Sequence, residues 1–267
     1  MLVKSEAIIL KSMKYGETSK IVTLYSKAYG KLKGITKGAR TAKNKFGSAL
    51  EPLTRSMVLM YKKEHRDLHL ISQCDVIESH KNLSEDLDCL TTALAIIELV
   101  HHVSHDEESN PVLFDLLSDI LRALNSRPKN YSSYFHAFRL RLASIFGYEP
   151  NFENCGNCGA RVPVGEDEKE FAFQIARGAV FCPRCKRPVD SFSNMDPNIP
   201  FISLSAGALQ SMRRLIHEPI PGLSTLEIDA HTGNQIDELL RLYLRFHLEG
   251  FRPLKSMELL IQNKAVS

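Results

Sequence analysis

Two Cys-x-x-Cys pairs constrain this chain more than any other feature of its sequence. Cys155 and Cys158 form the first pair, and Cys182 and Cys185 form the second. Each pair lies in a short stretch that contains Gly or Pro, so tight turns can direct all four thiolates at one point. This spacing predicts one structural Zn²⁺ per chain, because four thiolates complete a tetrahedral site and leave no open position for water or substrate.

A disulfide framework explains these cysteines less well than a metal does. Only Cys74 and Cys89 lie outside the quartet. The first thirty residues carry five lysines where a secretion signal would have an apolar core, so an oxidising compartment is not indicated. We therefore expect reduced thiolates that bind a metal.

A zinc deaminase is a second alternative for the cysteines. The run His105-Asp106-Glu107, followed much later by Cys182 and Cys185, is loosely similar to the His-x-Glu and Cys-x-x-Cys parts of those enzymes. That hypothesis leaves the first cysteine pair without a function, and the polar run from residue 105 to 110 predicts a loop. No other catalytic constellation stands out, so we do not expect an enzyme.

Charge divides the chain into a basic first part and an acidic remainder. Residues 1–81 hold 16 Lys or Arg against 7 Asp or Glu, a net charge of +9, and the remainder holds 18 against 24, a net charge of −6. The first part alone is thus expected to bind a polyanion. The most apolar stretch, residues 92–100, contains Glu98 and is too short to span a bilayer, so we expect a cytoplasmic protein without a membrane partner.

The first eighty residues show five short runs of β-forming residues separated by turn residues. The runs comprise residues 7–10, 19–25, 32–36, 54–61 and 68–77. Five short strands with a break between the third and fourth predict a small closed barrel over residues 1–80, of the OB-fold type. An SH3-like barrel is the main alternative.

The break between the third and fourth runs is strongly basic. It contains Lys37, Arg40, Lys43 and Lys45, together with glycines and the aromatic Phe46. Clustered cations can bind a phosphate backbone while an aromatic ring stacks on a base, although Phe46 could equally pack inside the fold. We expect this loop to bind nucleic acid, with a solvated loop as the alternative.

Beyond the barrel, apolar residues recur at helical spacing, which predicts an α-helical domain over residues 81–267. The expected helices span about 84–100, 111–124, 131–146, 205–216 and 234–248. In the first of them, Ser84 is a candidate N-cap and the inward face is Leu87, Leu90, Leu94 and Ile97. Short alternating stretches at 170–175 and 178–181 predict a β-ribbon within a zinc module at about 151–188. The fold class is therefore α+β with more than one domain.

Four segments, taken in order, resemble the bacterial RecO family of recombination mediators. They are Glu6-Ala7-Ile8-Ile9-Leu10, then Lys37-Gly38-Ala39-Arg40 with Phe46-Gly47, then Phe146-Gly147-Tyr148 before Cys155, and finally Pro253-Leu254-Lys255-Ser256. The similarity covers essentially the full chain. The chain departs from the family at Met257, where a basic residue often follows Lys-Ser.

The resemblance implies a nucleoid-associated protein of DNA repair. Members of the family bind single- and double-stranded DNA, anneal complementary strands, and work with RecR to load RecA on DNA coated by single-stranded-DNA-binding protein. By the same resemblance, the basic loop falls in the DNA-binding region and the four cysteines match the family's zinc site.

The resemblance also implies that the helical domain binds the acidic, Phe-ending tail of single-stranded-DNA-binding protein. Arg139 and Arg141 lie among the apolar residues Phe135, Phe138 and Leu142 on the third expected helix. One hypothesis is that they form one wall of the tail-binding groove, with a solvated helix face as the alternative. An RNA-binding OB-fold protein with a zinc ribbon, acting in translation or RNA processing, would show the same pattern, but it would prefer RNA over DNA of equal length.

Overall fold

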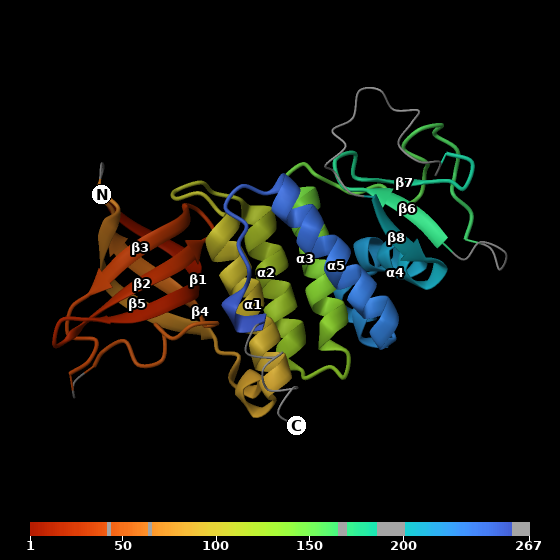
Figure 1. Cartoon of the computed structure of the whole chain (residues 1–267). Helices are drawn as coiled ribbons and strands as arrows, with labels where there is room; N and C mark the ends of the chain where they lie inside the picture. Colours follow the sequence, from red (N-terminus) through yellow and green to blue (C-terminus); the bar gives the residue numbers. More distant parts are fainter. Residues whose placement is uncertain (42–43, 64–65, 165–169, 186–200, 258–267) are drawn as a thin grey trace. The chain divides into compact units, whose positions relative to one another are not determined.

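The first five strands close into a barrel, and helices with a small second sheet make up the rest of the chain (Figure 1). The computed structural model describes residues 1–267 except 42–43, 64–65, 165–169, 186–200 and 258–267. The strands are β1 Leu2–Tyr15, β2 Ser19–Ser26, β3 Gly30–Thr36, β4 Arg55–Tyr61, β5 Leu68–Glu78, β6 Glu170–Gln174, β7 Ala179–Phe181 and β8 Phe201–Ser205. The α-helices are α1 Leu87–Val103, α2 Pro111–Asn125, α3 Tyr131–Ile145, α4 Ala206–His217 and α5 Ala230–His247, with 3₁₀ turns at Lys81–Glu85 and Ile220–Thr225.

The barrel closes because β1 is long enough to pair with two strands. Its strand order is β1-β2-β3-β5-β4, and only the β3–β5 pairing is parallel. The first half of β1 pairs with β4 and the second half with β2, with a bulge between Ile9 and Lys11 that bends the strand. The sequence pattern indicated only residues 7–10 of this strand, since its ends alternate less clearly. The structure confirms an OB-like barrel followed by a helical part that carries the cysteines.

Contacts divide the chain into two compact units, which are described separately. Unit 1 comprises residues 1–128 and 252–267, and unit 2 comprises residues 129–251. The strands end near residue 80, as the sequence indicates, but α1 and α2 belong to the same compact unit as the barrel.

In unit 1, the buried face of α1 differs from the expected one. Leu87 is 59% exposed, whereas Cys89, Ala93 and Ile96 are at most 1% exposed. Of the expected face, Ile97 is buried and Leu90 and Leu94 are half-buried, so the expectation was wrong in part. Most of this helix is apolar, and periodicity alone therefore could not choose its inward face. The N-cap is also not Ser84: Asp86 accepts a hydrogen bond from the backbone N–H of Cys89. By contrast, Pro111 begins α2 as predicted, with Asn110 as its cap.

The carboxy-terminal motif Pro253-Leu254-Lys255-Ser256 is held in unit 1 by a carboxylate of α1. Glu98 accepts hydrogen bonds from the backbone N–H groups of Lys255 and Ser256, both at 3.0 Å, and from the Ser256 hydroxyl at 2.7 Å. Burial would raise the pKa of Glu98, but the Ser256 and Lys255 donors outweigh it and hold that pKa below its ordinary value. The motif therefore has a structural role in this chain.

Replacing Glu98 by Ala is expected to release this segment. Each hydrogen bond to a charged group contributes about 1.5–3 kcal/mol, so the free energy of unfolding should fall by about 2 kcal/mol or more. Hydrogen exchange at residues 255–257 should accelerate as well. Ser256→Ala removes only the hydroxyl donor and is the matched control, with a smaller expected effect. Unchanged exchange in Glu98→Ala would mean that other contacts hold the segment.

Unit 2 combines three helices with a three-stranded sheet. The sheet has the order β7-β6-β8, and β6 and β7 form the β-ribbon that the sequence predicts. The third strand, β8, was not predicted; it pairs with β6 along all five of its residues and runs directly into α4. Across the residues that the structure describes, no helix has both the length and the apolar character needed to cross a membrane.

Candidate metal centre and nucleic-acid interface

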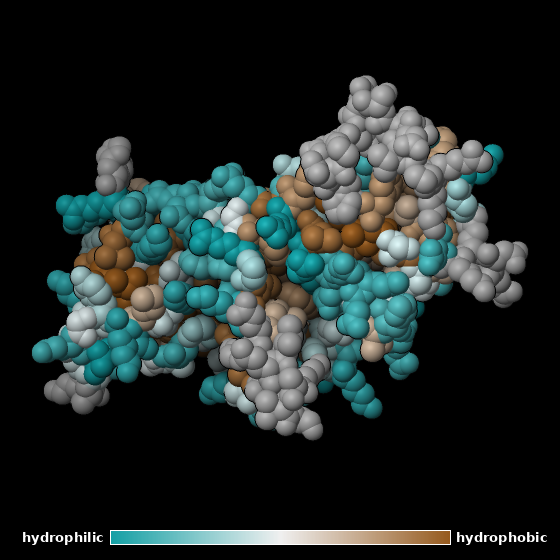
Figure 2. Space-filling view, in the orientation of Figure 1, coloured by the Kyte–Doolittle hydropathy of each residue, from teal (hydrophilic) through white to brown (hydrophobic). Residues whose placement is uncertain are grey.

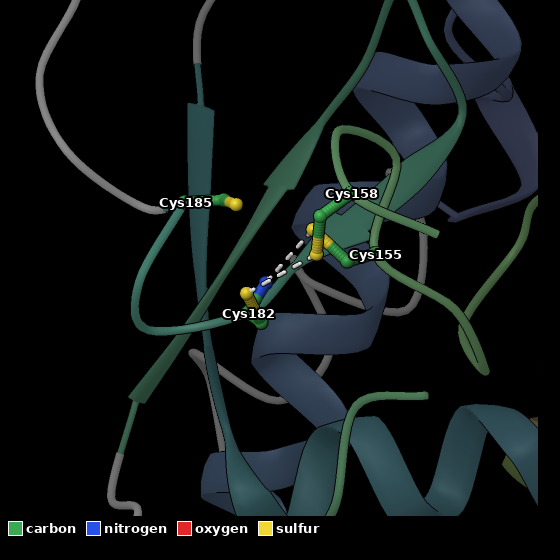
Figure 3. A group of neighbouring side chains, drawn as sticks. All are labelled: Cys155, Cys158, Cys182 and Cys185. Atoms are coloured by element: carbon green, nitrogen blue, oxygen red, sulfur yellow. Dashed lines mark hydrogen bonds between the residues drawn. The ribbon is translucent and has the colours of Figure 1, made fainter. Parts of the chain in front are cut away.

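The four cysteines of unit 2 come together although Cys158 and Cys182 are 24 positions apart in the sequence. Figure 3 shows their side chains converging from two turns. All four Sγ atoms lie within 4.8 Å of one another, and the Sγ atoms of Cys158 and Cys182 are 3.8 Å apart. A Zn–S bond of about 2.3 Å gives a tetrahedron with edges of about 3.8 Å, so the quartet has the dimensions of a metal site.

Local backbone structure explains why the first cysteine turn forms. The N–H of Gly156 donates to the carbonyl of Val180 on β7, which holds the turn on the sheet. A Cβ at Gly156 would lie 2.7 Å from the Cβ of Ala179, so only glycine fits there. Gly159 closes the turn with a φ of +71°, which favours glycine.

The described cysteines are all free of disulfides, as expected for metal ligands. Burial would raise the pKa of the Cys155 thiol, but backbone N–H groups of Cys158, Cys182 and Asn157 outweigh it and hold that pKa at about 6. Burial raises the pKa of Cys182 to about 11. A bound cation would displace the protons that remain on the thiols.

An arginine that the sequence did not point to supports this centre. The guanidinium of Arg213 on α4 donates to the carbonyl of Phe152 at 2.8 Å and to that of Val162 at 2.6 Å. These carbonyls precede and follow the first cysteine turn, so one side chain holds both ends of the loop. No local sequence pattern could indicate this contact, because Arg213 is more than fifty positions from both Phe152 and Val162.

The deaminase hypothesis has no support from the residues around His105. Asp106 and Glu107 do lie in a loop of unit 1, where Asp106 forms ion pairs with lysines of β3. Glu107 binds Lys62 at 2.6 Å and the ring of His69 at 3.1 Å. These carboxylates join the loop to the barrel and are not free to act as a general base.

The basic loop lies on the barrel beside the turn between β1 and β2. The backbone N–H of Arg40 donates to Thr18 O at 3.0 Å, and its guanidinium donates to Gly16 O at 2.9 Å. Lys37 is exposed, and Lys45 is exposed with its amino group 2.8 Å from Ser72 O. Lys43 lies outside the described residues. The loop thus presents cations at one end of the barrel.

Phe46 does not provide the stacking surface that its exposed basic neighbours suggested. It is 3% exposed and belongs to the hydrophobic core of the barrel with Leu50 and Val58. The stacking role is therefore wrong and the alternative, that Phe46 packs inside the fold, holds. Burial of the Phe46 ring removes apolar surface from water and so stabilises the barrel.

The arginines of α3 are engaged within unit 2. Arg139 is 6% exposed, and its guanidinium pairs with Asp237 on α5 and donates to the ring of His136 at 2.7 Å. Arg141 donates to the backbone carbonyls of Leu215 and Glu218. Phe138 is fully buried. The tail-docking role of these residues stays untested, but their side chains stabilise the fold and do not line an open groove.

Comparisons with known proteins identify the family to which this chain belongs. The family model "Recombination protein O N terminal" matches residues 1–80, and "Recombination protein O C terminal" matches residues 84–258. A "DNA repair protein RecO" of Pelotomaculum thermopropionicum is 31% identical over 255 residues, which cover 96% of this chain and 92% of that protein. Another, of Chloroherpeton thalassium, is 29% identical over 276 residues, which cover 98% and 99%. With matches to both family models and to full-length relatives, this chain belongs to the RecO family of DNA repair and recombination proteins.

Proposed function

We propose that this protein is a recombination mediator that binds single- and double-stranded DNA, anneals complementary strands and, with RecR, helps to load RecA onto DNA coated by single-stranded-DNA-binding protein. The observation that carries the proposal is the family match over both parts of the chain. The exposed cations Lys37 and Arg40 on an OB-like barrel support the DNA-binding part of it.

Strand annealing tests this proposal directly. Two complementary oligonucleotides are mixed with and without a coat of single-stranded-DNA-binding protein, and duplex formation is followed by fluorescence. A mediator should accelerate annealing in both conditions, whereas a generic binder would be blocked by the coat. Annealing that fails on naked and coated strands alike would contradict the proposal. An RNA-processing role is the alternative, and tighter binding of RNA than of DNA of equal length would favour it.

We further propose that the four-cysteine cluster holds one structural Zn²⁺. Four sulfur ligands at tetrahedral spacing favour zinc over harder cations such as Mg²⁺ or Ca²⁺, which prefer oxygen ligands. When bound, such an ion links the two cysteine turns and supplies no catalytic chemistry. The residues that would hold it are Cys155, Cys158, Cys182 and Cys185.

DNA affinity is expected to depend on the basic loop. Replacing Lys37 and Arg40 by Ala should weaken binding to all sequences alike and flatten the log–log salt dependence by about 0.7 for each lost contact with a single strand and about 0.9 with a duplex. Fluorescence anisotropy over a range of salt concentrations measures both quantities. Lys129→Ala, which removes an exposed charge of unit 2, is the matched control. Weaker binding at an unchanged slope would mean that the loop variants act through folding.

A further inference from the structure

The burial of Phe46 raises the question of where bases could lie, and the outer surface of the barrel offers an answer. Four apolar side chains stand in a row there, one on each of four neighbouring strands. Each lies directly opposite the next in the strand pairing, and opposite residues project from the same face of a sheet. This apolar row consists of Met13, Ile21, Ile35 and Leu70.

The apolar row points away from the barrel interior. Gly34 precedes Ile35, and a Cβ at Gly34 would lie 2.5 Å from Cδ1 of Ile71, which belongs to the barrel core. Neighbouring residues of a strand face opposite sides, so Ile35 faces outward. Met13 is 50% exposed, and the other three members of the row are half-buried. Figure 2 shows that the barrel displays apolar surface bordered by hydrophilic residues.

Lysines follow the apolar row on one side. Lys11 on β1 lies opposite Thr23 on β2, which in turn lies opposite Lys33 on β3. Each of the three is two residues along its strand from the member of the apolar row on that strand. Two residues of a strand span about 7 Å, so these cations run parallel to the apolar side chains at that offset. Lys33 shares an ion pair of 3.6 Å with the exposed Asp106.

The basic loop borders the other side of the row. Tyr15, which is 53% exposed, projects from the same face of β1 two residues beyond Met13. The turn that follows Tyr15 accepts both hydrogen bonds from Arg40, which holds the loop there. Cations thus lie on both sides of a strip of partly exposed apolar and aromatic side chains.

This alternation of charge and apolar surface fits a ligand that carries phosphates along its length and flat apolar groups beside them. A single nucleic-acid strand has that chemistry, since unpaired bases can pack on apolar side chains while phosphates meet lysines. A duplex does not, because its bases are stacked inside. The net charge of +9 on residues 1–81 disfavours a basic or neutral protein segment as the occupant.

We propose that the apolar row, extended by Tyr15, is the base-contacting surface for single-stranded DNA, with Lys11 and Lys33 on the phosphates. This inference rests on the proposed DNA-binding function and adds a division of roles to it. The basic loop binds the backbone of any DNA, whereas the row contacts bases and favours single strands over duplex.

The test combines a change in the DNA with a change in the protein. Wild-type full-length protein is titrated with oligothymidylate, with an abasic strand of equal length, and with a duplex. The row variant Met13→Gln with Ile35→Thr removes apolar surface without changing charge or β-propensity greatly. Val76→Thr with Ile77→Thr alters two residues of β5 outside the row, each 43% exposed, and is the matched control. Melting temperatures show that each variant is folded.

Wild-type protein should bind oligothymidylate roughly ten-fold more tightly than the abasic strand, in line with the contribution of base contacts in other single-strand binders. The row variant should lose most of this difference, keep the wild-type salt slope, and bind duplex as before. Equal wild-type affinity for the two strands would overturn the inference without any variant. A row variant that weakens duplex binding equally, or tighter wild-type binding of an RNA strand, would overturn it too. Failure of wild-type protein to bind any DNA would instead refute the proposed function.

Discussion

Replacing Cys158 by Ser is expected to leave unit 2 without its metal and largely unfolded around the cysteine module. The change removes one of four converging sulfurs and leaves three thiolates without a complete tetrahedral site. In small zinc modules the binding free energy is also folding free energy, about 10 kcal/mol or more at neutral pH. We expect metal-poor, aggregation-prone protein with a much lower melting temperature. Elemental analysis of the purified protein and thermal unfolding followed by circular dichroism measure both effects.

A second cysteine variant separates loss of the metal from loss of a thiol. Cys89 lies in unit 1, is 1% exposed, and its sulfur donates to the carbonyl of Leu124 at 3.3 Å. Ser can keep this hydrogen bond, so Cys89→Ser should retain one metal ion per chain and most of the stability. A chelator should lower the melting temperature of wild-type protein as Cys158→Ser does. A metal-free wild-type preparation with an unchanged melting temperature would contradict the structural role of the metal.

Replacing Arg139 by Glu is expected to destabilise unit 2 severely. The substitution would put a carboxylate beside Asp237, in a place where the guanidinium now pairs with that residue and lies 4.2 Å from the Phe135 ring centroid. Breaking a fully buried ion pair costs about 3–5 kcal/mol. Asp237 is 48% exposed, so solvent screens part of this pair, but a carboxylate at the buried position of Arg139 would also lose its hydration and repel Asp237. Burial and the nearby Arg139 charge lower the pKa of His136 to about 3, so this histidine is neutral in the wild-type protein. Chemical unfolding of the purified variant measures the loss.

Arg241→Glu is the matched control for this prediction. Arg241 is exposed on α5, so the same charge reversal should change the free energy of unfolding by less than about 1 kcal/mol. If Arg139→Glu were as stable as this control, the pair that the buried Arg139 forms with Asp237 would not contribute to the fold. Because the substitution is expected to unfold unit 2, loss of partner binding in an Arg139 variant would not by itself identify a docking site.

The sequence alone determined the features that depend on residue type at short spacing. Two cysteines three positions apart meet on one tight turn whatever surrounds them, so the quartet could be recognised before any fold was known. Short runs of β-forming residues between turn residues likewise indicated all five barrel strands. The strong helical stripe of α2, including Leu113 and Leu117, was predicted correctly for the same reason.

Only the tertiary structure decided which members of those patterns face solvent. Arg139 meets Asp237, 98 residues away, so its burial depends on how two helices pack and not on any local pattern. Phe46 sits among exposed lysines in sequence, yet its ring fills the barrel core. The apolar row exists only in the strand register, which joins Met13 to Leu70 through β2 and β3. Local sequence sets which side chains share a face, whereas long-range contacts set which faces are covered, because burial is a property of the assembled fold.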